Sequence, residues 1–230
     1  MPLPVVLVVD TGVDDALALM VAVRHPDLDL RGVVCTAGNV QLDQVLTNTC
    51  HVLDALDARV PVAGGANCRL DGLPFEPRSL HGPDGLAGLA PVHAAAPVSL
   101  PPPAAVVPPD AVIVSLGPLT SVVPLPAGRL VASYAEPGEA NYDLDPVAAH
   151  VLVASGRRVE HVRAGSGAVR AEAVSALERA GDPAGRLAAG LLRHQARRGA
   201  GLGDAGVLLS VVEPGLDPLD RLVGLLRRGH

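Results

Sequence analysis

The sequence predicts an α/β domain with a mostly parallel sheet and flanking helices, a Rossmann-like core. Runs of Val and Leu that end at polar residues alternate with helical patterns, which is typical of strands joined by crossover helices. The 230-residue chain is 49% hydrophobic and 18% charged, which suffices for one domain with a substantial core and excludes a disordered chain. We therefore expect a single domain over residues 1–230.

The alternation is clearest in the N-terminal part of the chain. Strands are expected at residues 5–9, 28–36 and 60–63, and helices at residues 14–24 and 42–56. The first helix has acidic residues in its first turn and Arg24 at its end, and Pro26 stops it. Each strand is followed by a helix, so the sheet is expected to be parallel.

The remainder of the chain is interrupted by proline. Residues 91–109 are dense in Pro and Ala and predict a linker or surface excursion, because proline prevents a continuous helix. Beyond it, strands are expected at residues 111–114 and 159–162, and helices at 145–155, 170–198 with a break near 181–183, and 204–212.

Composition excludes several functions. The net charge is −6 and all basic residues are arginine, so the chain lacks the cationic face that nucleic-acid binding requires. Three cysteines are too few for a disulfide framework or a zinc cluster and fit a reducing compartment. No signal peptide and no apolar run of membrane-spanning length is visible. We expect a cytoplasmic protein with neither nucleic-acid nor membrane partners.

Carboxylates gather where the first strand ends. Asp10 follows that strand, and Asp14 and Asp15 lie in the first turn of the next helix. In open α/β sheets, ligands bind beyond the carboxyl ends of the strands. Ionised carboxylates this close repel one another unless a cation lies among them, and oxygen ligands favour Ca²⁺ or Mg²⁺ over zinc. The alternative is that Asp14 and Asp15 merely favour the start of the helix.

Six segments carry a resemblance to a known family. The sequence DTGVDDALAL at residues 10–19 resembles the N-terminal aspartate cluster of the inosine-uridine-preferring nucleoside hydrolases. Five further segments resemble that family in the same order: TAGN at 36–39, HGPDGL at 81–86, LGPLT at 116–120, the stretch from Glu139 to Ala149, and Asp204 with Ala205. The resemblance implies a nucleoside hydrolase-like core.

The resemblance also implies a reaction, the Ca²⁺-dependent hydrolysis of the N-glycosidic bond of a ribonucleoside or related riboside. A cation lowers the pKa of a bound water, and a carboxylate that touches both cation and water, here Asp10, can take its proton. The implied catalytic residues are Asp10, Asp14 and His81; the substrate-binding residues are Asp14, Asn39, Glu139, Asn141 and Asp204; the Ca²⁺ ligands are Asp10, Asp15, Asp204 and the carbonyl of Leu116. His81 either faces the leaving group or is solvent-exposed. Members of the family form homo-oligomers, which makes a homo-oligomer possible for this chain.

The chain also departs from the family pattern. It is shorter, and Val8 stands where the family has an Asp, Gly203 where a His precedes the late Asp, Ser121 in place of Asn and Ala140 in place of Phe. The residues implied for metal and ribose are retained, whereas those facing the base are eroded. Three explanations stay open: a hydrolase with an altered substrate, a relative repurposed for another ribosyl compound, and a non-catalytic protein that binds a ribosyl compound or a partner without turnover.

Overall fold

The computed structural model describes residues 1–76, 79–91, 100–126, 128–132, 138–162 and 168–227. Its centre is a six-stranded sheet in which every neighbouring pair is parallel, in the order β3-β2-β1-β4-β5-β6. The strands are β1 (Leu3–Val9), β2 (Leu28–Cys35), β3 (Val62–Gly64), β4 (Val112–Ser115), β5 (Leu130–Ala132) and β6 (Val159–His161). This is the strand order of a doubly wound α/β fold, and it confirms the expected fold class.

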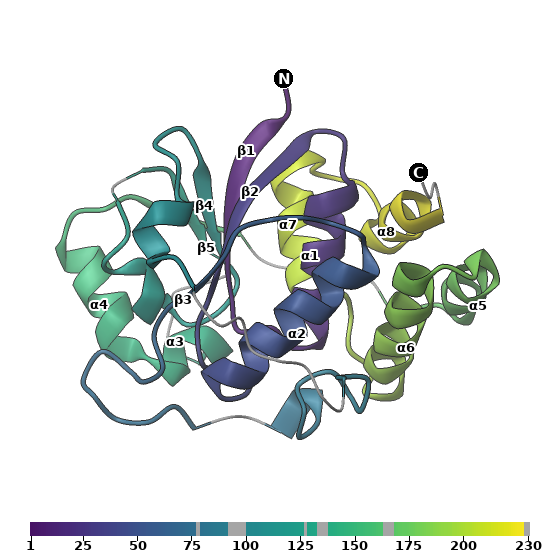
Figure 1. Cartoon of the computed structure of the whole chain (residues 1–230), viewed down its shortest axis with the longest axis horizontal. Coiled ribbons are helices and arrows are strands. Elements are labelled where there is room, and N and C mark those ends of the chain that lie inside the picture. Colours follow the sequence, from purple (N-terminus) through teal and green to yellow (C-terminus); the bar gives the residue numbers. More distant parts are fainter. Residues whose placement is uncertain (77–78, 92–99, 127, 133–137, 163–167, 228–230) are drawn as a thin grey trace.

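Helices cover both faces of the sheet (Figure 1). They are α1 (Val13–Arg24), α2 (Leu42–Ala55), α3 (Ala140–Leu144), α4 (Pro146–Ala154), α5 (Ala171–Ala180), α6 (Pro183–Arg197), α7 (Asp204–Val212) and α8 (Pro218–Arg227). α1, α2 and α5–α8 lie on one side of the sheet, and α3 and α4 lie on the other. Among the described helices, none is long and apolar enough to cross a membrane.

The strand β1 contributes to the core on both of its faces. Val5, Leu7 and Val9 pack in the cluster that contains α1, whereas Val6 and Val8 pack in the cluster that contains α4. Burial on both faces explains why this strand is a continuous apolar run rather than an alternating one.

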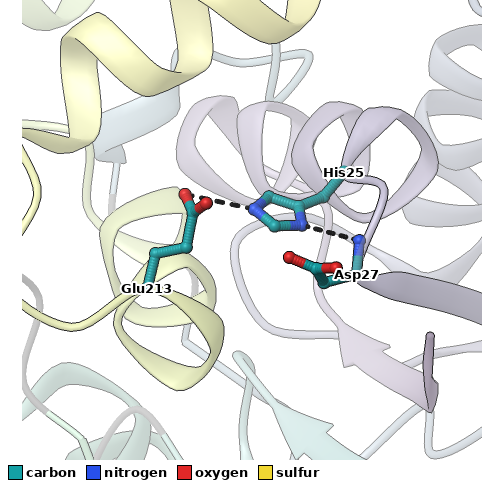
Figure 2. Close-up of side chains that lie close together, drawn as sticks. All are labelled: His25, Asp27 and Glu213. Atoms are coloured by element: carbon teal, nitrogen blue, oxygen red, sulfur yellow. Dashed lines mark hydrogen bonds and ion pairs between the residues drawn. The ribbon is translucent and has the colours of Figure 1, made fainter. Parts of the chain in front are cut away.

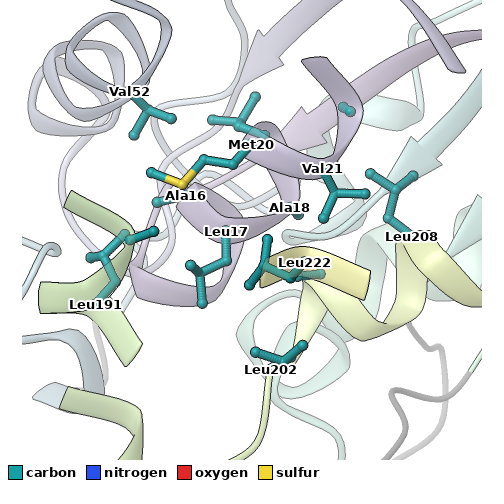
Figure 3. Close-up of a cluster of buried hydrophobic side chains, with 14 of the residues drawn as sticks. Ala16, Leu17, Ala18, Met20, Val21, Val52, Leu191, Leu202, Leu208 and Leu222 are labelled. Carbon is teal, nitrogen blue, oxygen red and sulfur yellow. The ribbon is translucent and has the colours of Figure 1, made fainter. Parts of the chain in front are cut away.

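The helix α1 is the centre of the larger cluster (Figure 3). Its residues from Ala16 to Val21 are all fully buried. Leu17 and Met20 lie in one buried cluster with Leu191 of α6 and Leu222 of α8. A helix that is apolar on every side must be surrounded by other elements. The elements beside α1 therefore share one hydrophobic core with it.

The helices and strands expected from the sequence are present, with small shifts. β3 begins at Val62, two residues later than expected, after Pro61, which has no N–H to donate to a strand. Part of the Pro-rich stretch, residues 92–99, lies outside the described residues. Its end is a 3₁₀ helix, Pro103–Val106, and Val106 is buried against the sheet near Gly32. That end is therefore part of the core rather than a linker.

Candidate active site

The predicted site residues lie at one edge of the sheet. Asp10 directly follows β1, Leu116 directly follows β4, and Asn39 lies in the loop after β2. β1 and β4 are neighbours in the sheet. The strand that follows β1 in sequence, β2, lies on one side of this pair, and the strand that follows β4, β5, lies on the other side. A crevice opens at such a switch point, and it is where doubly wound folds bind ligands. Asp10, Asn39 and Leu116 thus all lie beyond the carboxyl ends of parallel strands, at the same edge of the sheet.

Asp10 is held in a tight backbone cradle. Its Oδ2 accepts a hydrogen bond from the backbone N–H of Asn39 at 2.8 Å. A Cβ added at Gly38 would lie 2.9 Å from Asp10 Cγ, and one added at Gly117 would lie 2.7 Å from Asp10 Oδ1. The side chain is buried, and burial raises the pKa of Asp10 to about 7. Both glycines are therefore needed to let the backbone approach this carboxylate.

Asp14 and Asp15 lie in the first turn of α1, and one carboxylate oxygen of each lacks a hydrogen bond among the described residues. Asp15 Oδ2 accepts from Gly12 N at 2.9 Å and from Asn39 Nδ2 at 3.3 Å. The Oδ1 atoms of Asp14 and Asp15 are buried and have no hydrogen-bond partner within the part of the chain that is described. Buried carboxylate oxygens without partners are costly, and a bound cation would satisfy them.

Asp204 completes the acidic cluster. It is the first residue of α7, and Asp14, Asp15 and Asp204 each place one carboxylate oxygen within 4.8 Å of the others. Burial raises the pKa of both Asp15 and Asp204 well above the ordinary range. Several carboxylates with unpartnered oxygens fit a hard divalent cation. The cluster thus differs from the ligand set that the family resemblance implies. Asp14 is a member of the cluster, whereas Asp10 lies beside it.

Glu139 and Asn141 reach the same place from α3. Glu139 caps this helix, and its Oε2 accepts from the backbone N–H groups of Asn141 and Tyr142 at 3.0 and 3.2 Å. Asn141 Nδ2 donates to the carbonyl of Leu116 at 2.7 Å. A carbonyl oxygen has a second lone pair, so this bond leaves Leu116 able to accept from another group. The cap therefore orients both predicted ribose-binding side chains.

His81 is buried in the wall of the site rather than exposed to solvent. Its Nδ1 accepts a hydrogen bond from the N–H of Val13 at 3.1 Å and lies 3.6 Å from Asp14 Oδ1. Burial lowers the pKa of His81 below its ordinary value. The ring is therefore neutral at neutral pH, and because Nδ1 accepts, its proton is on Nε2.

These groups line one cavity of about 220 Å³. Of the predicted site residues, the cavity is lined by Asp10, Asp14, Asn39, His81, Leu116, Glu139, Asn141 and Asp204. Asp15, which is fully buried, is not in the lining but lies next to it through Asp14 and Asp204. The structure thus brings the predicted residues together from six separate parts of the sequence.

The sequence analysis missed two polar residues of this cavity, Gln195 and Arg198. Both lie at the C-terminal end of α6, which reads as an ordinary amphipathic helix. Gln195 follows Leu191 by four residues and shares its buried face. A polar residue at an apolar-face position was the one available signal.

The backbone beside Asp204 excludes a side chain. Gly203 has φ 54° and ψ −124°, a conformation that essentially only glycine adopts. A Cβ added there would lie 2.7 Å from the Cβ of Asp14. The position where the family pattern has a histidine is therefore built for glycine in this chain.

A second group of ionisable side chains lies at the other end of α1 (Figure 2). His25 accepts from the N–H of Asp27 through Nδ1 at 3.1 Å, and its Nε2 lies 3.2 Å from Glu213 Oε2. Arg221 Nε donates to the same oxygen at 2.6 Å. The arginine supplies the positive charge that a metal ion would bring, so this group joins α1 to the end of α7 and to α8.

Comparison with known proteins identifies the class. A sequence model described as "Inosine-uridine preferring nucleoside hydrolase" matches residues 5–125, which is just over half of the chain. The chain belongs to this family. The acidic cluster at the edge of the sheet, which could hold a metal ion, thus lies in a nucleoside hydrolase fold.

Curated relatives match a shorter part of the chain. The non-specific ribonucleoside hydrolase RihC of Escherichia fergusonii is 39% identical over 88 residues, which are 38% of this chain and 29% of that protein. RihC of Escherichia coli strain K12 / DH10B matches to the same extent. The chain thus aligns with less than a third of the length of these relatives.

Solved structures match nearly the whole fold. A purine-preferring ribonucleoside hydrolase from Gardnerella vaginalis gives a TM-score of 0.80 at 22% identity, over 93% of this chain and 81% of that chain. A plant nucleoside hydrolase gives 0.75 at 24% identity, over 94% and 80%. At these identities the structures establish the shared fold.

Proposed function

We propose that the protein hydrolyses the N-glycosidic bond of a ribonucleoside or related riboside, in a Ca²⁺-dependent reaction that yields free base and ribose. The observation that carries this proposal is the union, in one cavity, of an acidic cluster with unpartnered buried oxygens and the polar side chains of Asn39, Glu139 and Asn141. Membership of the nucleoside hydrolase family supports it. The small volume of about 220 Å³ suits a compact polar ligand.

The acidic cluster would hold the cation. Asp15, Asp204 and the Leu116 carbonyl are the proposed ligands together with Asp10, and Asp14 contributes an oxygen from the same cluster. Calcium–oxygen distances are about 2.3–2.6 Å. When bound, Ca²⁺ would supply positive charge that acidifies water and fixes hydroxyl groups.

The chain's own groups account for the remaining chemistry. The Asp10 carboxylate takes a proton from a water molecule whose oxygen attacks C1′, and the pair of electrons of the C1′–N bond leaves with the base. A carboxylate that contacts both the cation and the water is placed to take this proton, and Asp10 lines the cavity beside the acidic cluster. Asp14, Asn39, Glu139 and Asn141 hold the ribose hydroxyl groups, so an analogue that lacks a hydroxyl leaves one of them unpaired.

The alternative function, binding of a ribosyl compound without turnover, is favoured by two observations. Gly203 brings no side chain to the cavity, and the neutral His81 is a poor proton donor. A binding protein would need the ribose contacts but no group that assists the departure of a base.

A screen for reducing sugar distinguishes the two functions. Purine, pyrimidine and modified ribonucleosides and p-nitrophenyl riboside are incubated with the protein, with added Ca²⁺ or with a chelator. We expect Ca²⁺-dependent release of ribose from at least one substrate. Asp10→Asn should abolish it while the amide oxygen still accepts from Asn39 N–H, so that circular dichroism shows an unchanged fold. Absence of turnover with every substrate, together with ribose binding, would contradict the proposal and favour the alternative.

A further inference from the structure

We infer that Thr120 positions α3 for ribose binding, through a buried hydrogen bond to Asp145. The inference rests on the proposed function, in which Glu139 and Asn141 bind hydroxyl groups of the ribose. Thr120 and Asp145 lie behind the cavity and are not among the residues that line it. Both would therefore act through the helix that they hold and not by touching a ligand.

The helix α3 is too short to hold its own position. It has five residues, and isolated helices shorter than about 12–15 residues are marginal in water. Glu139 caps its first turn, but this bond lies within the helix itself. Its buried side chain, Leu144, packs only in a small cluster with Ala37 and Phe75. The orientation of its polar side chains therefore depends on hydrogen bonds to other elements.

Two such hydrogen bonds join α3 to the segment that follows β4. At the start of both segments, Asn141 Nδ2 donates to the carbonyl of Leu116 at 2.7 Å. At their end, Thr120 Oγ1 donates to Asp145 Oδ2 at 2.6 Å. Since one bond lies at each end, the pair fixes both the distance and the direction of α3 relative to the end of β4.

The carboxylate of Asp145 is fully buried and accepts from three donors. Besides Thr120, these are the N–H of Leu70 at 2.7 Å and the N–H of Ala148 at 3.0 Å. The bond from Ala148 is the N-cap of α4, for which Ser, Thr or Asn would also serve. Those side chains have fewer acceptor sites than a carboxylate, and a carboxylate is costly to bury. An Asp at this position is therefore best explained by its bonds to Thr120 and Leu70.

Apolar packing already holds the surroundings of Thr120. Thr120 lies on the 3₁₀ helix Leu119–Val122. The side chains of Leu119 and Val122 are in one buried cluster with Ala149 and Leu152 of α4. The hydroxyl group of Thr120 is thus not needed to fill this core. What it adds is a directed bond to the residue that ends α3.

The experiment measures the binding of methyl β-ribofuranoside and of its 2-, 3- and 5-deoxy analogues by calorimetry at saturating Ca²⁺. In the wild type, an analogue that leaves a buried polar group unpaired should bind roughly 10- to 100-fold more weakly than the parent. Asn141→Ala identifies the penalty that α3 causes, because this penalty disappears with the side chain.

Thr120→Val retains the shape of the side chain and removes the hydroxyl group. It should reduce the α3-dependent penalty by roughly 10-fold, while the penalties for the other hydroxyl groups stay as in the wild type. A merely structural role would weaken the parent and every analogue alike and leave all ratios unchanged. Thr120→Ser, which keeps the hydroxyl group, should restore the wild-type ratio.

Ser121→Ala is the matched control. Ser121 is buried on the same 3₁₀ helix, and its Oγ accepts from the N–H of Ala66 at 2.8 Å. Its loss should leave every ratio unchanged.

Asp145→Asn is the second variant, in case Thr120→Val does not fold. It keeps a side-chain oxygen for the cap of α4 but loses the oxygen that Thr120 and Leu70 share. It should reduce the same ratio, with a native circular dichroism spectrum.

The outcomes separate this inference from the proposed function. An unchanged ratio in folded Thr120→Val or Asp145→Asn, an equal change in Ser121→Ala, or no penalty that depends on Asn141 would overturn the inference alone. Because binding is measured, binding without turnover would contradict only the proposed hydrolysis. Failure of methyl β-ribofuranoside to bind the wild type would overturn the proposed ribose site and the inference with it.

Discussion

In the proposed hydrolysis, the cavity offers little help in protonating the leaving group. His81 is neutral, since burial lowers its pKa and its Nδ1 accepts from Val13. Gly203 has no side chain, and Arg198 does not give up its proton. General-acid assistance is worth about 10²–10⁴-fold. We therefore expect kcat/KM for p-nitrophenyl riboside, which leaves without protonation, to exceed that for inosine by about that factor.

The assay follows p-nitrophenolate by absorbance and ribose from inosine as reducing sugar, both at saturating Ca²⁺. His81→Ala should change kcat/KM for p-nitrophenyl riboside by much less than the 10²-fold that loss of a general acid costs. Gly203→His should not restore inosine hydrolysis, because φ 54° and contact with Asp14 oppose any side chain; the expected strain is about 1–3 kcal/mol. Equal kcat/KM for inosine and p-nitrophenyl riboside would refute the reasoning, since some other group would then supply the proton.

Three further predictions concern stability. Burial raises the pKa of Asp10 from 3.8 to about 7, so between these pH values the cation-free folded state keeps a proton that the unfolded chain loses, and the free energy of unfolding falls as the pH rises. The gain in melting temperature on adding Ca²⁺ should therefore be larger near pH 8 than near pH 5. An equal gain at both pH values would argue against Ca²⁺ binding at these carboxylates. Gly32→Ala should destabilise by about 1–3 kcal/mol in urea unfolding, because its Cβ would overlap the backbone at Val106, whereas Gly224→Ala in α8, with nothing within 4 Å, should stabilise by about 0.5–1 kcal/mol. Met20→Ala, at a fully buried position of α1, should cost about 2–5 kcal/mol in the same assay, and a loss below about 1 kcal/mol would contradict the packing in Figure 3.

The parts of the fold that could be predicted are those whose own sequence carries a long apolar run or a complete helical pattern. The run at residues 5–9 reads as a strand because β1 is buried on both faces, and α1 has its acids, its apolar body and its stop signal in sequence. The elements that were missed are short or ambiguous. β5 has three residues and α3 has five, too few for a period to show. α8 was also missed, although it has ten residues.

The site divides in the same way. Asp10, Asn39 and Leu116 could be placed because each follows a strand, and parallel strands bring such residues to one edge. The position of Asp204 beside Asp14 and Asp15 could be inferred only from the family resemblance, since it depends on where α7 begins in space. Nothing in the local sequence separates that packing from any other.

The two parts of the cavity depend on different elements of the fold. The half of the cavity proposed for ribose is formed by strand ends, by the first turn of α1 and by α3, so its geometry is tied to the central sheet. The other half depends on the end of α6 and on its contacts with the carbonyl of Leu80. A substitution at Gln195 or Arg198 touches neither β1 nor the acidic cluster. The lining that α6 contributes can therefore vary while the groups proposed to act on C1′ stay in place.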